Sequence, residues 1–172
     1  MKRLFLMIGG GIALMAGIVS VGLRSVRAET AISPALTNLP TGYREWRLIS
    51  VAHEEGKQND IRAILGNEIA FRAARDASPV YPDGAIIARL AWNYVSSDEN
   101  NRAFGQNQSF IAGAPTNVQF MVKDSAKYAS TGGWSFVQFN QGKLADAAGF
   151  GACFGCHVPV KSRDYVFNRY SP

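Results

Sequence analysis

The sequence is poor in cysteine and histidine, with two of each in 172 residues. A structural zinc site needs about four such ligands. Cys153, Cys156 and His157 lie together, and only His53 lies elsewhere, so zinc is a poor match. A chain of this length can bury a hydrophobic core without a framework of disulfides, and the sequence contains no internal repeat or low-complexity segment.

Dense clusters of lysine and arginine are absent from residues 29–172. Four of the 18 basic residues and none of the 13 acidic residues lie in residues 1–28, which leaves a net charge of +1 for the rest. The basic pI of about 9.4 therefore owes much to the N-terminal segment. We exclude nucleic acid as a partner.

The long hydrophobic run of the sequence lies at its N-terminus, from Leu4 to Leu23, directly after Lys2 and Arg3. Together with the small residue Ala28, this order is typical of a secretory signal peptide, residues 1–28, cleaved after Ala28. The run is also long enough for a retained membrane anchor that faces the periplasm, and this alternative stays open. Both interpretations place the rest of the chain in a periplasm or an equivalent space.

The remainder predicts a single α+β domain, with a predominantly antiparallel β-sheet and a few short helices. Residues 29–41 are expected to form an extended lead-in because Pro34 and Pro40 disfavour a helix, and the folded domain is expected over residues 42–172. β-branched, aromatic and alternating residues predict strands over 43–51, 61–65, 85–92, 118–122 and 134–139. We expect short helices over 67–77, capped by Asn67, and from Asp124 to Gly132, with a loop or edge hairpin over 96–108.

Residues Cys153 to His157 have the C-x-x-C-H form that marks c-type haem attachment. The two thiols can form thioethers with two vinyl groups, and the adjacent imidazole can bind the iron. The alternatives are a disulfide, half of a zinc site, or a thioredoxin-like redox pair, which is expected near a βαβ unit. Export and the adjoining histidine favour haem, so we predict one covalent haem c with His157 as the metal ligand.

The second axial position of the iron has few candidates, because the usual ligands are His and Met. Residues 29–172 offer only His53 and Met121. His53 lies in a polar stretch typical of a solvated loop, and Met121 lies in an alternating strand where it is expected to pack in the core. We therefore expect five-coordinate iron that is open to a small molecule. An electron carrier with Met121 as sixth ligand is the alternative.

Several separated motifs resemble the cytochrome P-460 family, which includes the cytochromes c′-beta. They are Gly42-Tyr43-Arg44-Glu45-Trp46, Ile61-Arg62, Pro82-Asp83-Gly84, Val122-Lys123-Asp124-Ser125, Gly133-Trp134, Ala152 to His157, and Asp164-Tyr165-Val166-Phe167. The resemblance implies a mostly antiparallel β fold, usually a homodimer, with a five-coordinate haem c. It also implies ligands such as hydroxylamine, nitric oxide or carbon monoxide.

The resemblance also assigns residues to the haem pocket. Members that oxidise hydroxylamine carry a lysine bonded to the haem ring, and the matching position here is Arg89, whose guanidinium stays protonated. An acidic distal residue of at least one active member aligns near Gln119, which cannot act as a carboxylate base. Arg62 matches a distal arginine of the family. The differences at Arg89 and Gln119 favour ligand binding over hydroxylamine chemistry.

Arg62 and Arg89 are each a lone cation within an apolar strand, and a buried cation needs a partner. One interpretation is that both form structural salt bridges with Asp or Glu. The other is that one of them donates hydrogen bonds to a bound ligand or to a haem propionate. Trp134 and Phe136 are expected to be core residues around the haem.

Together these features predict an exported mono-haem c-type cytochrome with an open distal site for nitric oxide or a related small nitrogen species. One alternative is an enzyme that oxidises hydroxylamine or nitric oxide. The other is an electron-transfer cytochrome that meets a redox partner protein.

Overall fold

The computed structural model describes residues 34–146 and 150–172. The predicted signal peptide and its cleavage point, and the first part of the expected lead-in, lie outside these residues. Residues 34–41 form neither helix nor strand, and Leu36 and Leu39 pack against a buried cluster of the sheet. No helix within the described ranges is long and apolar enough to cross a membrane.

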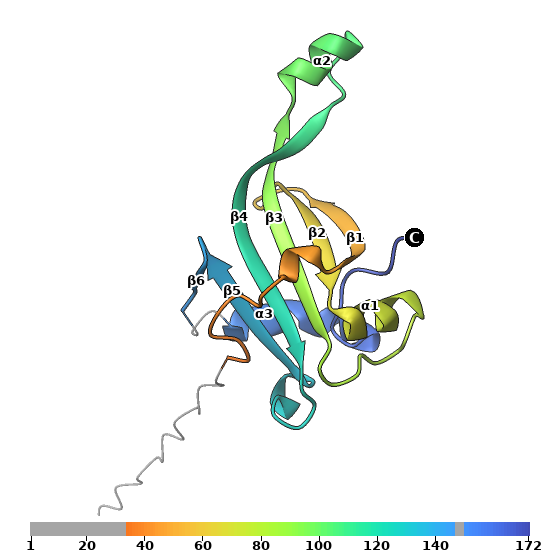
Figure 1. Ribbon diagram of the computed structural model, residues 1–172, viewed down its shortest axis with the longest axis vertical. Helices are drawn as coiled ribbons and strands as arrows, with labels where there is room; N and C mark the ends of the chain where they lie inside the picture. Colours follow the sequence, from red (N-terminus) through yellow and green to blue (C-terminus); the bar gives the residue numbers. More distant parts are fainter. Residues whose placement is uncertain (1–33, 147–149) are drawn as a thin grey trace, which may run out of the picture. The chain divides into compact units, whose positions relative to one another are not determined.

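A six-stranded antiparallel sheet forms the centre of the domain, and each strand pairs with the next one along the chain (Figure 1). The strands are β1 (Arg47–Glu54), β2 (Asp60–Gly66), β3 (Ile86–Ser96), β4 (Phe110–Lys123), β5 (Trp134–Asn140) and β6 (Lys143–Leu144). Antiparallel neighbours need only short connections, so this order follows the chain directly. The α+β fold dominated by antiparallel strands is confirmed.

Three α-helices and three 3-10 helices join or flank the strands. They are η1 (Tyr43–Glu45), α1 (Glu68–Arg75), α2 (Asp98–Phe104), η2 (Ala129–Thr131), α3 (Phe150–His157) and η4 (Val158–Arg163). The helix predicted after Asn67 is confirmed as α1. The Asn67 side-chain oxygen accepts a hydrogen bond from the backbone N–H of Ala70 at 2.9 Å, as an N-cap does.

Two of the segments predicted from the sequence differ in the structure. The strand expected from Tyr43 begins only at Arg47, because Gly42 has a left-handed φ of 69° and starts η1. The polar stretch expected to be a loop or hairpin contains α2, since the Ser97 hydroxyl accepts from the N–H of Asn100 at 3.3 Å and caps a helix.

The helix of one to two turns expected from Asp124 to Gly132 is confirmed only as a short 3-10 helix. Asp124 accepts a hydrogen bond from the N–H of Lys127 at 2.9 Å, which closes a turn. Only the 3-10 helix η2 follows, ending at Gly132 with a left-handed φ of 68°. The capping signal at Asp124 and the predicted stop at Gly132 are therefore confirmed, but the segment between them is a turn followed by a 3-10 helix.

β3 and β4 extend well beyond their predicted ends. Residues 94–96 pair with residues 110–112, and neither segment pairs with β2 or β5 there. This two-stranded ribbon, which we call the arm, projects from the sheet and carries α2 at its tip (Figure 1). Most of β4 in the arm is exposed, so it lacks the inward-facing apolar pattern that reveals a strand in a sequence.

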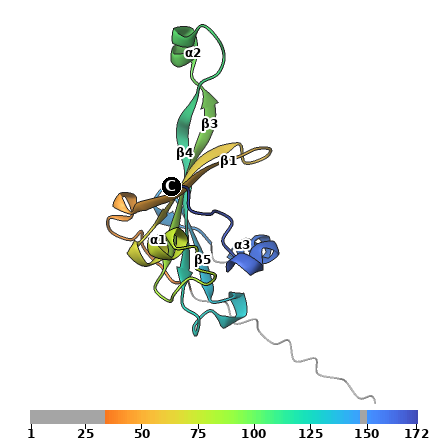
Figure 2. The ribbon, with the colours of Figure 1, turned by 90° about the vertical axis from the view of Figure 1, so that its right-hand side faces the viewer.

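The sheet has a packed cluster of buried side chains on each face, and α3 lies on one side while η1 lies on the other (Figure 2). The α3 face carries Ile64, Ile87, Met121 and Phe136 together with α1 residues, and the η1 face carries Leu65, Leu90, Phe120, Val137 and Phe139. Trp134 is fully buried, so the expectation that Trp134 and Phe136 are core residues is confirmed.

Candidate functional site

The C-x-x-C-H motif forms the C-terminal half of α3, which the sequence did not identify as a helix. Relative to Cys153, Cys156 is at i+3 and His157 at i+4, so all three lie on the same side of the helix. Cys153 is half-buried and Cys156 is exposed. Burial raises the pKa of the Cys153 thiol, and the neighbouring Cys156 adds to this effect.

The orientation of His157 is fixed by a backbone acceptor. Its Nδ1 lies 2.6 Å from the carbonyl oxygen of Tyr165. Since a carbonyl oxygen only accepts, Nδ1 carries the proton and Nε2 is the nitrogen that can bind a metal. Burial lowers the pKa of His157, which favours the neutral, metal-binding form. The rings of Phe136 and Phe167 lie 4.9 Å and 5.0 Å from the imidazole.

Two rows of side chains cross the α3 face beside His157. Residues directly opposite each other in antiparallel strands share a face, and the strand pairing aligns Ile87, Met121 and Phe136 as an apolar row. The next row on the same face lies two residues along each strand, which is about 7 Å away. It consists of Arg89, Gln119 and Gln138, and we call it the polar row.

Hydrogen bonds join the polar row into a network. Arg89 donates from Nη1 to the side-chain oxygens of Asn117, at 2.8 Å, and Gln119, at 3.2 Å. Gln119 in turn donates to the side-chain oxygen of Gln138 at 2.7 Å. Arg89 Nη2 pairs with a carboxylate oxygen of Asp60. Burial, and next the charge of Arg62, lower the pKa of Arg89, while Asp60 opposes them.

Sequence reasoning missed Asn117, Gln138 and Asp60 in this network, and of these Asp60 is the charged one. It is 3% exposed, and its second oxygen accepts from Arg62 at 2.8 Å. One carboxylate therefore bridges two arginines. The sequence did contain a signal that Asp60 could pair with Arg62. Residues two apart in a strand share a face, and Asp60 precedes Arg62 by two positions. Strand β2 was expected to begin one residue later, which left Asp60 in a loop.

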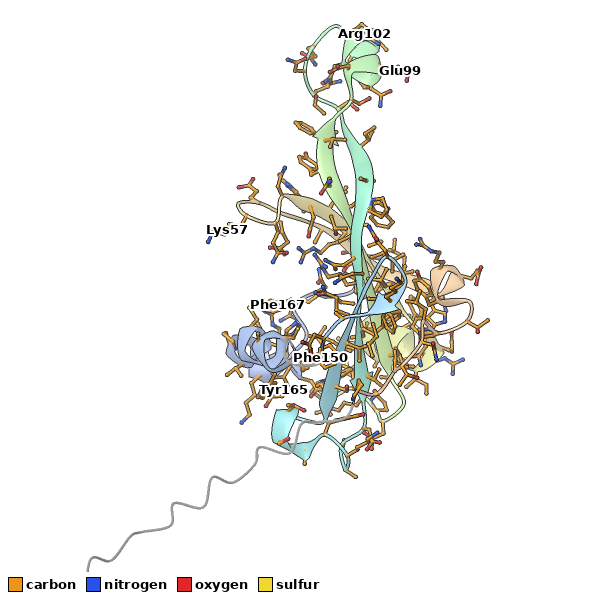
Figure 3. The ribbon with its side chains drawn as sticks, turned by 90° about the vertical axis from the view of Figure 1, so that its left-hand side faces the viewer. Lys57, Glu99, Arg102, Phe150, Tyr165 and Phe167 are labelled. Carbon is orange, nitrogen blue, oxygen red and sulfur yellow. The ribbon has the colours of Figure 1, made fainter. Side chains whose placement is uncertain are left out.

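The structure thus brings Arg62, Arg89 and Gln119 into one network on the face where α3 lies. The salt-bridge interpretation of both arginines is confirmed, while their role toward a ligand stays a prediction. The turn between β1 and β2, which carries Lys57, projects on the same side of the sheet as Phe167 and α3 (Figure 3).

The two candidates for a second axial ligand are both packed against other side chains. His53 lies in β1 and not in a loop, and its exposed ring stacks on Tyr94 at 3.8 Å. It is paired with Ile61, so it faces away from the side that carries Arg62. Met121 is 9% exposed and belongs to the buried cluster of the α3 face.

These donors fit a haem group better than a bare metal ion. Two thiols and an imidazole share one side of α3. The rings of Phe136 and Phe167 lie against His157, and Phe154 packs on Phe136, which provides the apolar surface that a porphyrin needs. No group of three or more His, Cys, Asp or Glu side chains among the described residues could hold a metal ion.

Comparison with known proteins agrees with this chemistry. The family model for cytochrome P460 matches residues 40–168, a span that includes the polar row, Asp60 and α3. A search of curated proteins found no match.

Proposed function

This chain belongs to the cytochrome P460 family, whose members bind haem, and from that premise we propose that it is an exported cytochrome with one covalent haem c. We further propose an open distal site for nitric oxide or a related small nitrogen species. Cys153 and Cys156 would hold the group through thioethers, and His157 would bind its iron. When bound, haem would supply an iron centre to which the small ligand could bind.

The observation that carries the proposal is the position of the polar row, two residues along the strands from the apolar row, whose Phe136 ring lies 4.9 Å from the His157 ring. A guanidinium has five N–H donors, and the contacts of Arg89 with Asn117, Gln119 and Asp60 use three of them. Arg89 therefore has further N–H donors on the α3 face. Charged donors form stronger hydrogen bonds than neutral ones, so they suit a ligand with partly negative oxygen.

The same network argues against the oxidation of hydroxylamine. The position of the cross-linking lysine is occupied by Arg89, whose guanidinium is engaged by Asp60. Gln119 has no carboxylate to act as a base, and both oxygens of Asp60 are already occupied by arginines. Against the electron-carrier alternative, Met121 is part of the packed core.

The optical spectrum of the purified ferrous protein tests the proposal. We expect a high-spin, five-coordinate spectrum that changes on titration with nitric oxide or carbon monoxide. A low-spin split band would instead establish a second protein ligand and an electron carrier. A red-shifted band of a modified ring would restore the hydroxylamine-oxidising enzyme.

A variant connects the binding to the polar row. Gln119→Leu removes an amide from the network and should speed the release of nitric oxide from the ferrous protein. Gln106→Leu is the matched control, because Gln106 lies just beyond α2 at the tip of the arm. Equal release rates in Gln119→Leu, Gln106→Leu and the wild type would contradict a role for the row.

Export is part of the same proposal and has its own test. N-terminal sequencing of the protein from a periplasmic fraction should find Glu29 as the first residue. A chain that keeps Leu4–Leu23 and sediments with membranes would show the retained anchor instead.

We also propose that the protein is a homodimer, as the family resemblance implies, and, as a separate proposal, that a redox partner protein reduces its haem. Light scattering on the haem-bound protein should give twice the mass of one chain, and a monomer would contradict the first proposal. Reduction of the haem by periplasmic electron carriers would support the second.

A further inference from the structure

A buried lysine lies at the end of β4 on the α3 face. Lys123 Nζ lies 2.8 Å and 3.0 Å from the two carboxylate oxygens of Asp164 and donates to the carbonyl oxygen of Gly132 at 3.1 Å. The two charged side chains are 3% and 8% exposed. Burying such a pair is costly unless its hydrogen bonds are well satisfied, and here the donors of Lys123 all have acceptors.

The acidic partner of this ion pair is the first of two consecutive residues with left-handed backbone conformations. Asp164 has a φ of 51° and Tyr165 a φ of 64°. Residues other than glycine rarely adopt this region, and a bulky tyrosine keeps it only when its surroundings hold it in place. The turn therefore depends on contacts outside its own backbone.

The side chain and carbonyl of Asp164 provide those contacts. One carboxylate oxygen accepts from the backbone N–H of Tyr81 at 2.8 Å, and the carbonyl oxygen accepts from the indole N–H of Trp134 at 2.9 Å. Lys123 binds the same carboxylate and lies 4.9 Å from the Trp134 ring. Asp164 is thus fixed from β4, from β5 and from the segment before β3.

The turn matters because the next carbonyl is the acceptor for the proximal histidine. Tyr165 follows Asp164 directly, and its carbonyl oxygen lies 2.6 Å from His157 Nδ1. The direction of that carbonyl is set by the backbone angles of the two left-handed residues. In metal sites, such an outer acceptor orients the imidazole and makes it a more basic ligand.

We infer that Lys123 and Asp164 are positioning residues that set the axial bond of His157 to haem iron through the carbonyl of Tyr165. This inference rests on the proposed function, because it takes His157 as the axial ligand. The ion pair does not touch the imidazole. It holds the turn whose carbonyl keeps Nδ1 protonated and the ring in one orientation.

The test is made on haem-bound protein with Asp164→Asn and with the double variant Lys123→Met, Asp164→Asn. A less well-directed Tyr165 carbonyl weakens the bond to Nδ1 and leaves the imidazole less basic. The iron–histidine stretching band of the ferrous protein should therefore move to lower wavenumber, and the reduction potential should become more positive. The single variant leaves Lys123 buried without its counterion and is expected to be destabilised.

The double variant separates an effect on the bond between His157 and iron from an effect on the stability of the fold. It removes both buried charges, so it should recover stability lost in Asp164→Asn while keeping the shifted band and potential. Leu90→Ala is the control, because it removes core packing on the η1 face and should lower stability without moving the band.

The outcomes distinguish this inference from the proposed function. An unchanged band and potential in a folded double variant would overturn the inference and leave the haem assignment intact. A wild-type protein with no iron–histidine band would instead overturn the proposed function, which requires five-coordinate ferrous iron bound by His157.

Discussion

Replacing Asp60 with asparagine removes the carboxylate that pairs with both Arg62 and Arg89. The Asp60 residue is 3% exposed, and one of its oxygens accepts from Arg62 at 2.8 Å while the other pairs with Arg89. Asparagine has a similar shape but no charge and only one acceptor oxygen. Arg62 and Arg89 would then repel each other in a largely buried site.

The expected loss of stability follows from the contacts that remain. Removing one partner of a buried ion pair costs about 3–5 kcal/mol. We expect the lower end, about 3 kcal/mol, because Arg62 keeps Glu54 at 3.4 Å and Gln58 at 2.6 Å, and Arg89 keeps Asn117 at 2.8 Å. For a domain of this size, that loss lowers Tm by about 10 °C.

Thermal unfolding of the haem-bound protein, followed by circular dichroism, measures the effect. Glu68→Gln is the control, since it breaks the exposed ion pair with Arg72 on α1 and should leave Tm nearly unchanged. An Asp60→Asn protein that melts together with the wild type would refute the reasoning, because the two arginines would then not need the anion between them.

Three further substitutions make separate predictions. Gly132→Ala should lower the free energy of unfolding by about 2–4 kcal/mol in urea titrations. Gly132 has a φ of +68°, and a new Cβ would lie 2.1 Å from the Tyr165 ring; an unchanged midpoint would contradict this clash. Ser125→Ala should raise the pKa of Asp83 toward its ordinary value in an NMR titration, because the Ser125 hydroxyl donates to Asp83 at 2.7 Å and lowers that pKa. A lowered carboxyl pKa adds stability above the ordinary value and loses it as pH falls through the lowered one, so the two proteins should differ near neutral pH and converge in acid. The prediction fails if the two Asp83 titration curves coincide. Met121→Leu should leave the ferric optical spectrum nearly unchanged, because Met121 packs in the core, whereas a change from low spin to high spin would identify it as an iron ligand.

The central sheet could be predicted because its residues alternate between two packed faces. The interior of β2, β3 and β5 was identified from β-branched and aromatic residues, and the cap at Asn67 identified α1. The arm could not be predicted in this way. Its strands have no core to face, so their pattern carries no apolar period.

The part of the site that a sequence motif defines could be predicted. The part that depends on tertiary contacts could not. The spacing of Cys153, Cys156 and His157 identifies the attachment segment, and Arg62 and Arg89 could be recognised as cations that need partners. Asp60 is the partner that they share, and it reaches Arg89 because β2 pairs with β3. That pairing could not be predicted from the sequence alone. The acceptor for His157 depends likewise on the left-handed turn at residues 164–165.

Covalent attachment of haem at Cys153 and Cys156 is the central claim, and extraction with acidified organic solvent tests it most directly. The account predicts that wild-type protein keeps its haem after extraction and has the mass of the chain plus one haem, bonded to these two residues. The variant Cys153→Ala, Cys156→Ala should release its haem completely. Haem that leaves the wild-type protein in the solvent would contradict the claim.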